Sequence, residues 1–292
     1  MKSSSVSVVV VSFNTKEMLV RTLNSIPKNN LIKKIFVSDN GSTDGSISEV
    51  ERLSKKDSRI ELIQNNSNLG FSKANNIAKN YVQTPYVLFL NPDTQIVADP
   101  ITKLVEYMDL HKEVYAATCK VVLPDRKLDK DTRRSFPTPL VSLMHFSMLD
   151  RIFPQNKLFS RYWYGYISED EDHEVEVIQG AFLLTRKDVL DKVGWFDEDY
   201  FLDGEDIDLC WKISKLGGKL LYLPSSGVIK HFKKGSKSKN KSMKSIYSGV
   251  VAMKLFYKKR LSHQYPWYVS RIVYFGIHLL VGIRIVKFKL GL

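Results

Sequence analysis

The sequence predicts an α/β protein built on a Rossmann-like, doubly wound and mostly parallel sheet. Two observations carry this prediction. Short β-branched and apolar runs, typical of strands buried on both faces, recur four times before residue 93. The first three runs are each followed by a segment with helical spacing of apolar residues, so strand and helix alternate. Sheets of this kind bind ligands at the carboxyl ends of their strands.

The first half of the chain shows this alternation most clearly. We expect strands over residues 6–12, 35–38, 60–63 and 86–90, and helices over residues 15–26, 46–55 and 72–81. Polar, turn-prone residues follow every expected strand. They are Ser12, Phe13 and Asn14, then Asp39, then Asn65–Asn68, and finally Asn91–Asp93. Four strand ends with such residues indicate a binding site along one edge of the sheet.

The second half is less regular. Residues 101–111 and 186–193 have helical spacing, while residues 116–123, 177–184 and 220–223 are strand-like. Residues 124–175 contain several prolines, many aromatic residues and an acidic run, which predicts long loops over one face.

Composition restricts the class of protein. The 292 residues include 43% hydrophobic and 26% charged residues, which is typical of a globular protein. The two cysteines lack CxxC spacing, which argues against a zinc site or a disulfide framework and favours a cytoplasmic location. The N-terminus lacks the pattern of a signal peptide.

The net charge of +13 is unevenly distributed. After Asp208 the chain contains 18 Lys and Arg and no acidic residue, whereas the preceding part contains 26 basic and 31 acidic residues. The basic tail leads into an aromatic and apolar stretch, residues 265–284. Only 12 residues separate Arg271 from Arg284, so we expect a helix lying in a membrane interface rather than crossing it. The alternative is a helix packed on the body or on the second subunit of a homodimer. No motif supports nucleic-acid binding.

Four carboxylates lie within six positions, at Asp203, Glu205, Asp206 and Asp208. Carboxylates so close together repel one another and often serve to hold a proton, a cation or a substrate hydroxyl. The same residues also suit the first turn of a helix. Their spacing alone leaves both interpretations open.

Several motifs, taken together and in order, resemble the family 2 inverting glycosyltransferases of GT-A fold. They are Ser7–Asn14, Val37–Gly45, Asn68–Asn76, Phe89–Asp93, Gly180–Arg186, Trp195–Trp211 and His231. The pattern is most similar to the rhamnosyltransferase-like branch that builds bacterial polysaccharides. The resemblance implies a glycosyltransferase domain over residues 1–235, with a nucleotide-binding half at about 1–98 and an acceptor half at about 99–235. Residues 236–292 would then form a basic, amphipathic helical C-terminal appendage.

The resemblance also implies roles for the strand-end residues. Asp39 would contact the base or ribose of the nucleotide, with Ser12, Phe13 and Asn14 beside the base. Asn68 and Lys73 would lie near the nucleotide and the diphosphate, and Asn91 would hydrogen-bond the ribose or a phosphate. The alternative for Lys73 is an ordinary solvated helix residue.

Inverting sugar transfer requires a base for the acceptor hydroxyl and positive charge at the diphosphate leaving group. The resemblance assigns the base to Asp206, with Glu205 on acceptor hydroxyls. It assigns a divalent cation, Mg²⁺ or Mn²⁺, to Asp93 and His231. This chain has Asn91-Pro92-Asp93 where many relatives have Asp-x-Asp, which removes one formal charge from the metal site.

The resulting hypothesis is an enzyme that moves a sugar from a nucleotide diphosphate to a hydroxyl of a lipid-linked or polymeric glycan. The branch implies dTDP-rhamnose as donor, with UDP-galactose, UDP-glucose or UDP-galactofuranose as alternatives. The enzyme would act in the cytoplasm at the inner face of the plasma membrane. A nucleotidyltransferase is disfavoured because the loop after the first strand, Ser12–Lys16, lacks glycine. A non-catalytic nucleotide-sugar-binding module remains a second alternative.

Overall fold

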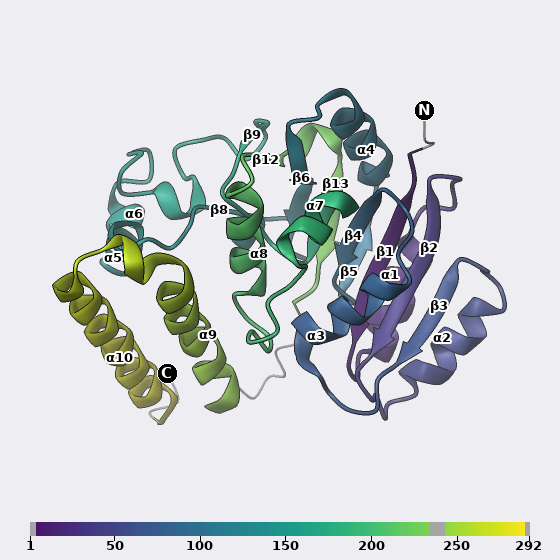
Figure 1. The fold of residues 1–292 in the computed structure, drawn as a ribbon, viewed down its shortest axis with the longest axis horizontal. Coiled ribbons are helices and arrows are strands. Elements are labelled where there is room, and N and C mark those ends of the chain that lie inside the picture. Colours follow the sequence, from purple (N-terminus) through teal and green to yellow (C-terminus); the bar gives the residue numbers. More distant parts are fainter. Residues whose placement is uncertain (1–3, 234–242, 290–292) are drawn as a thin grey trace.

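The computed structural model describes residues 4–233 and 243–289, and its centre is an eight-stranded sheet (Figure 1). The strand order is β3-β2-β1-β4-β11-β6-β12-β9, and every pair is parallel except those that involve β11 or β9. The predicted mostly parallel α/β sheet is therefore confirmed. Its strands are β1 (Val6–Ser12), β2 (Ile32–Asp39), β3 (Ile60–Gln64), β4 (Tyr86–Leu90), β6 (Val114–Thr118), β9 (His173–Glu174), β11 (Phe182–Arg186) and β12 (Lys219–Tyr222).

Helices cover both faces of this sheet because successive side chains of a strand point to opposite sides. Val8 and Val10 of β1 belong to one apolar layer, and Val9 belongs to the other. The first layer packs against α1 (Lys16–Ser25), α2 (Ser46–Ser54) and α4 (Pro100–Leu110). The second packs against α3 (Gly70–Ile77), α7 (Lys187–Val193) and α8 (Glu205–Ser214). This arrangement leaves the strand ends as the open edge.

Two small sheets lie beside the main one. The first contains β5 (Thr94–Ile96), β13 (Val228–His231) and β7 (Lys120–Val122), and the second pairs β8 (Arg133–Arg134) with β10 (Val177–Ile178). Two predicted strands, 116–123 and 177–184, are each divided because the chain passes from one sheet to another within them. Pairing of β13 with β5 sets His231 opposite Thr94, next to the loop that follows β4.

The region predicted as long loops, residues 124–175, also contains two short helices, α5 (Pro139–Phe146) and α6 (Leu149–Ile152). Thr138 caps α5 by accepting a hydrogen bond from the Val141 N–H, and Pro139 occupies the first turn. The sequence did not reveal these helices because their large apolar residues do not form one buried stripe; Leu140 and Leu143 are exposed.

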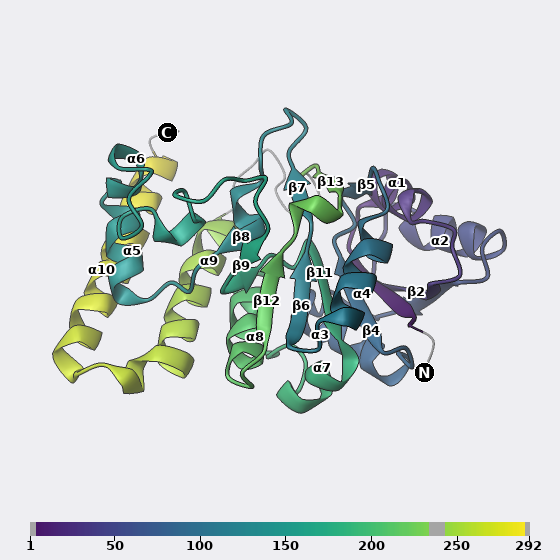
Figure 2. The same cartoon turned by 90° about the horizontal axis from the view of Figure 1, so that it is seen from above.

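The C-terminal part forms a helical hairpin at the end of the molecule farthest from α2 (Figures 1 and 2). It contains α9 (Met243–Phe256), a π-helical turn (Tyr257–Leu261) and α10 (Trp267–Lys289). Phe256, Tyr257 and Leu261 pack into the same apolar layer as α8. The predicted domain boundary at residues 235–236 lies outside the described residues.

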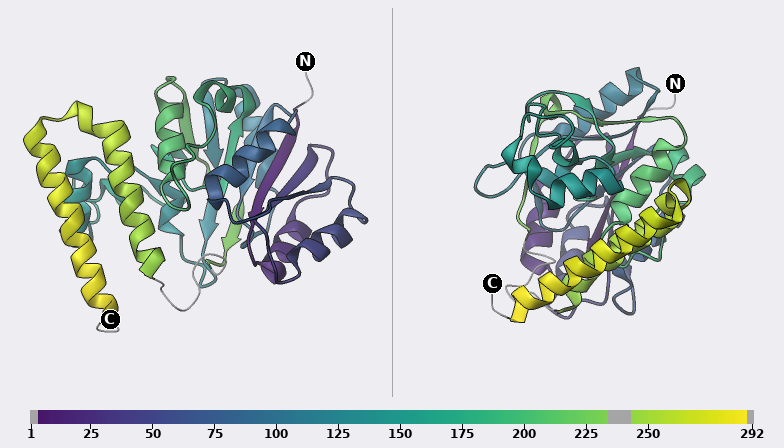
Figure 3. Two further views of the ribbon diagram at one scale, coloured as in Figure 1. Left: turned by 60° about the horizontal axis from the view of Figure 1, so that its bottom comes forward. Right: turned by 90° about the vertical axis from the view of Figure 1, so that its left-hand side faces the viewer.

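The prediction that the apolar C-terminal stretch is too short to cross a bilayer is wrong. Trp267–Val286 is one helix whose 20 residues are long and apolar enough to do so by length and composition. Arg271 and Arg284 do not shorten it, because long side chains of arginine can extend along a helix towards a polar layer. In the structure one face of α10 packs along α9 (Figure 3).

Candidate active site

The ends of β1 and β2 are joined by hydrogen bonds. Ser12 and Asp39 are register partners, and both are buried. The Asp39 carboxylate accepts hydrogen bonds from the N–H and the hydroxyl of Ser42, each at 2.7 Å. Asn14 has a positive φ of 52° and accepts from the Thr43 N–H at 2.8 Å. The loops after the two strands are thus tied together, with Phe13 left 42% exposed beside them.

The neighbouring loop after β3 is ordered by asparagine side chains. The Asn65 amide donates to Asn40 at 3.0 Å, and the Asn40 amide donates to the Gly70 carbonyl at 3.1 Å. Asn68 accepts from the Gly70 N–H at 3.0 Å. Lys73 lies one helical turn further along α3 and is exposed. The loop is therefore polar and well connected, and Lys73 is accessible to an anion.

Asp93 and His231, which are far apart in the sequence, face each other at the end of β4. The distance from His231 Nε2 to Asp93 Oδ1 is 3.3 Å, and both side chains are buried. The other ring nitrogen, Nδ1, lies 2.9 Å from Asp129 Oδ2. Lys233 Nζ lies 2.7 Å from the second oxygen of Asp129. Asp129 thus fixes the orientation of the imidazole ring so that Nε2 points towards Asp93.

The electrostatics of this cluster follow from its burial. Burial alone would lower the pKa of His231, but hydrogen bonds to Asp129 and Asp93 outweigh it and raise the pKa to about 9. Burial would raise the pKa of Asp129, but its bonds to His231 and Lys233 lower it to about 2. Without a cation, therefore, a protonated imidazole holds the two carboxylates together.

The Asp93–His231 pair fits two of the ligands of Mg²⁺ or Mn²⁺. Adjacent ligands of an octahedral ion bound at about 2.1 Å lie about 3 Å apart, close to the distance between the two ligand atoms. Within residues 4–233 and 243–289 no group of three or more His, Cys, Asp or Glu has the arrangement of a complete metal site. The remaining ligands would have to come from a bound diphosphate and water, as is common for Mg²⁺.

Asp206 lies in the first turn of α8 and forms a buried ion pair with Arg134 of β8. Arg134 Nη2 lies 2.5 Å from Asp206 Oδ2, and the two side chains are 10% and 9% exposed. The Gly180 N–H donates to the same oxygen at 3.3 Å, whereas Oδ1 accepts from the Ile207 N–H at 2.8 Å. Burial lowers the pKa of Arg134, but the facing Asp206 outweighs it and raises the pKa well above its usual value.

The four carboxylates around α8 have different surroundings. Asp203 accepts a hydrogen bond from Ser248, and Asp208, fully buried, forms an ion pair with Arg260 at 2.6 Å. Glu205 is buried with one oxygen lacking a partner among the described residues. Burial, followed by the charge of Asp206, raises the pKa of Glu205 well above its ordinary value. Both effects favour the protonated form of the Glu205 carboxyl.

Glycines bring the start of α8 close to the strand ends. Gly180 lies between Phe71 and Asp206, and its neighbour Ala181 accepts a hydrogen bond from the Asn91 N–H at 3.0 Å. Gly70 has a φ of +80°, and a Cβ atom there would lie 2.4 Å from the carbonyl oxygen of Phe201. The close approach of these segments places Asp206 beside the edge that carries Asn91 and Asp93.

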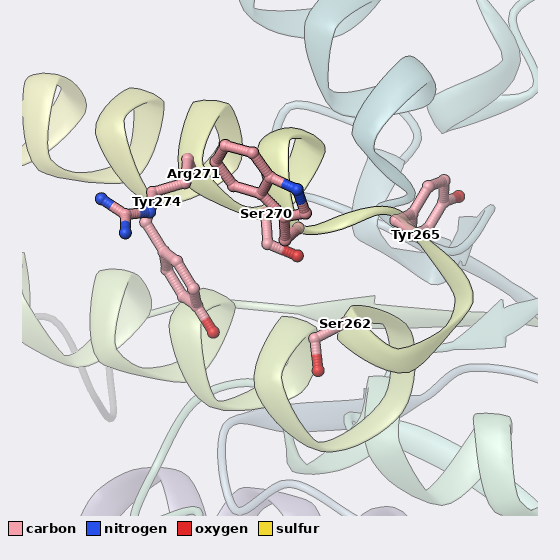
Figure 4. A pocket seen from close by; sticks show the side chains of 6 residues that line it. Ser262, Tyr265, Ser270, Arg271 and Tyr274 are labelled. Carbon is pink, nitrogen blue, oxygen red and sulfur yellow. The ribbon is translucent and has the colours of Figure 1, made fainter.

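A hollow of 390 Å³ lies elsewhere, between the π-helical turn and the start of α10 (Figure 4). Its lining includes Ser262, Tyr265 and Arg271 but no strand-end residue. We place the candidate active site at the strand ends, because the facing carboxylates, histidine and amides gather there.

The family model for glycosyl transferase family 2 matches residues 7–194 of this chain. The chain belongs to this family. Relatives of this glycosyltransferase include rhamnosyltransferase WbbL of Escherichia coli, 26% identical over 77% of this chain and 82% of the relative. The N-acetylglucosaminyl-diphospho-decaprenol L-rhamnosyltransferase of Mycobacterium tuberculosis is 27% identical over 68% of this chain and 66% of its own length. The resemblance to the rhamnosyltransferase-like branch is therefore confirmed.

Solved structures confirm the GT-A fold of the glycosyltransferase. The mannosyltransferase PcManGT of Pyrobaculum calidifontis, solved with GDP-Man and Mn²⁺, superposes with a TM-score of 0.60 at 17% identity. S. aureus TarS, solved with UDP-GlcNAc, also gives 0.60 at 17% identity. This chain is covered to 88% and 86%, but it spans only 64% and 65% of those chains.

The geometry of this glycosyltransferase involves two residues that the sequence did not single out. Asp129 orients His231 across 102 positions, and Arg134 pairs with Asp206 across 72 positions. Neither spacing gives a local signal, and both residues lie in the irregular segment. The structure also separates Asp208 from Asp206, because residues two positions apart on a helix face different directions, and Asp203 lies before the helix begins.

Proposed function

We propose that this glycosyltransferase transfers L-rhamnose from dTDP-rhamnose to a hydroxyl of a lipid-linked or polymeric bacterial glycan, with inversion at the anomeric carbon. The observation that carries this proposal is the placement of Asp206 beside the strand edge that holds the facing pair Asp93 and His231. In this proposal Asp206 is the base and the Asp93–His231 pair marks the diphosphate-binding region, the two groups that a single displacement requires.

In the proposed reaction Asp206 accepts the proton of the acceptor hydroxyl. The acceptor oxygen forms a bond to the anomeric carbon as the bond from that carbon to the diphosphate breaks. Asp206 Oδ1 accepts a single hydrogen bond among the described residues, so one lone pair is open to the proton. Arg134 holds the other oxygen and keeps the carboxylate oriented. Glu205, one of whose oxygens has no partner among the described residues, would bind an acceptor hydroxyl.

Asp93 and His231 would hold a divalent cation, Mg²⁺ or Mn²⁺, against the diphosphate. When bound, the cation supplies positive charge to the leaving group. The GT-A structures solved with Mn²⁺ support a divalent cation in general. Asn91 would bond the ribose or a phosphate, and Lys73 would add charge near the diphosphate.

The nucleotide itself would lie across the ends of β1 to β3. Asp39 would accept from the base or ribose, exchanging its bonds with Ser42, and Phe13 would lie against the base beside Ser12 and Asn14. Asn68 would bond the nucleotide from the third loop. We place these roles in the N-terminal half, about residues 1–98, and acceptor binding in residues 99–235.

The donor and acceptor are inferred from the relatives' names. Two named rhamnosyltransferases match this chain, and one is named for an acceptor on a diphospho-decaprenol lipid. A glucosyltransferase of Escherichia coli named for UDP-Glc is 28% identical over 112 residues, which makes UDP-glucose the second candidate donor. A lipid-linked acceptor places the enzyme at the inner face of the plasma membrane, which the basic C-terminal tail would contact.

The base is tested by Asp206→Asn, with Asp203→Asn as the matched control in the same cluster. We expect transfer by Asp206→Asn to fall about 10²–10⁴-fold, the usual contribution of a general base, and Asp203→Asn to stay near wild type. Undiminished turnover of Asp206→Asn would refute its role.

The donor and the cation are tested together by thermal stabilisation. We expect dTDP-rhamnose with Mn²⁺ to raise the melting temperature more than UDP-glucose does, and Asp93→Ala or His231→Ala to abolish the part that depends on Mn²⁺. His111→Ala, a partly exposed histidine that follows α4, is the control. A larger shift with UDP-glucose would replace the donor assignment.

A further inference from the structure

Helix α10 has two apolar faces, and only one of them is covered. Val273, Tyr274 and Ile277 pack towards α9 and the body. The opposite face is exposed along the whole helix, at Tyr268, Ile272, Phe275, Leu279, Ile283 and Val286. Their spacing of three or four residues forms one continuous stripe, bordered by Arg271 and Arg284. An exposed apolar stripe of this length on a helix indicates an interaction surface.

The segment of residues 139–158, which we name the α5–α6 segment, exposes a second set of large apolar side chains. They are Leu140, Leu143, Phe146, Met148, Ile152, Phe153 and Leu158, each at least 39% exposed. The segment contains one carboxylate, Asp150, whose side chain is 8% exposed and bonded to His145 at 2.8 Å. The exposed charges of the segment, Arg151 and Lys157, are therefore basic.

The two apolar surfaces lie at the same end of the molecule. Figures 1 and 2 place α5, α6 and α10 together, opposite α2, and Figure 3 shows α10 lying across this end. Phe136, just before α5, stacks with Phe256 of α9 at 6.4 Å and meets Trp211 of α8 edge to face at 4.8 Å. These aromatic contacts fix the α5–α6 segment relative to the helical hairpin.

We propose that the α5–α6 segment and the exposed face of α10 form one docking surface for a bilayer that contains anionic lipids. A bilayer matches the combination of apolar stripes, basic borders and a lack of exposed carboxylates. This inference rests on the proposed membrane placement. It adds a second membrane-binding element, the α5–α6 segment of the catalytic body, to the C-terminal tail.

A second copy of the chain suits the surface less well. In a two-fold antiparallel pair of α10 helices centred near His278, Arg271 of one copy would lie near Arg284 of the other. No carboxylate follows Asp208 in the sequence, so α10 offers no acid to compensate this repulsion. The negative charge of lipid phosphates, by contrast, neutralises these arginines directly.

The tip of the hairpin has groups that suit the headgroup layer. The hollow of 390 Å³ at the start of α10 is lined by the hydroxyls of Ser262, Ser270 and Tyr274 and by Arg271 (Figure 4). Trp267, 74% exposed, also lines it, and the exposed Tyr268 follows Trp267 in the chain. Aromatic rings with a polar tip, next to arginine, are typical of the membrane–water interface.

The experiment is co-sedimentation of the full chain with phosphatidylcholine vesicles that contain about 30% phosphatidylglycerol, an anionic lipid. Two variants interrupt the surface separately: Leu143→Ser with Ile152→Ser, and Phe275→Ser with Leu279→Ser. The matched control is Val97→Ser with Leu110→Ser, which are exposed apolar residues outside both the α5–α6 segment and α10.

We expect each surface variant to bind these vesicles at least about tenfold more weakly than wild type, and the control to bind normally. Wild-type-like binding by the Leu143→Ser/Ile152→Ser variant would overturn the role of the α5–α6 segment. A wild-type dimer that ignores vesicles and dissociates on Phe275→Ser/Leu279→Ser would instead assign α10 to a second copy. Vesicle binding is measured without donor, while sugar transfer to a water-soluble acceptor tests the proposed function separately.

Discussion

The Arg134–Asp206 ion pair gives the sharpest prediction about the site. Replacing Arg134 with Met preserves much of the side-chain volume but removes the positive charge. Asp206 would then keep its two backbone hydrogen bonds, from Gly180 and Ile207, without the cation that offsets its burial. Glu205, the residue before Asp206 in the helix, would then lie beside an Asp206 carboxylate whose charge is no longer neutralised.

The magnitude follows from the burial of the pair. Both side chains are at most 10% exposed, so removing one partner leaves a nearly buried charge uncompensated. Such a change typically costs about 3–5 kcal/mol of stability, whereas removing both charges costs much less. We therefore expect Arg134→Met to lose about 3–5 kcal/mol, and Arg134→Met combined with Asp206→Asn to be more stable than the sum of the single changes predicts, by about 2 kcal/mol or more.

The measurement is urea unfolding of the four proteins in this double-mutant cycle, followed by steady-state transfer kinetics for Arg134→Met. A lower kcat with an unchanged KM for the donor would indicate that Arg134 positions the base rather than the nucleotide. A loss of stability below about 1 kcal/mol, or additive effects in the cycle, would refute the reasoning.

Three further changes test other parts of the structure. Burial raises the pKa of Glu205 in the folded state, so between the ordinary pKa of 4.5 and that raised pKa the folded protein binds more protons than the unfolded one. Stability should therefore fall as pH rises above 4.5, and Glu205→Gln should gain on wild type by about 1.4 kcal/mol per pH unit in thermal melts, with no gain near pH 4. Gly70→Ala should lose about 2–4 kcal/mol in urea unfolding, since its Cβ meets a backbone oxygen at 2.4 Å and its φ is +80°; a smaller loss than Ala74→Gly would contradict the close approach. Arg260→Met should lower the free energy of unfolding by about 2–4 kcal/mol, because it leaves the fully buried Asp208 without its partner. Lys258→Met, an exposed position two residues earlier, should change it by almost nothing in the same assay.

The sequence predicted the sheet well because its strands are buried on both faces. Such strands must be continuous apolar runs, so β1 and β4 were located to the residue. The strands that cross between sheets were less accurate. β6 and β7 read as one run, since the sequence pattern records burial but not which sheet receives the side chain.

Only part of the candidate site could be predicted from the sequence. Strand-end residues could be grouped in advance because parallel strands bring their carboxyl ends to one edge. Asp129 and Arg134 could not, because their partners His231 and Asp206 lie in other segments and the pairing depends on tertiary packing. Within the acidic cluster the resemblance assigns roles to Asp206 and Glu205 only, and the structure adds that helix geometry directs Asp206 and Asp208 to different partners.

The change in composition after Asp208, from a nearly neutral sequence to a strongly basic one, coincides with the place where the C-terminal part is bonded to α8. Two residues of α8 form ion pairs with arginines from other segments. Asp206 pairs with Arg134, which precedes α5 in the chain, and Asp208 pairs with Arg260, which precedes α10. Each arginine therefore connects α8 to one half of the docking surface. The basic tail is thus connected to the catalytic body through Asp208, and the proposed base lies one helical half-turn from that connection.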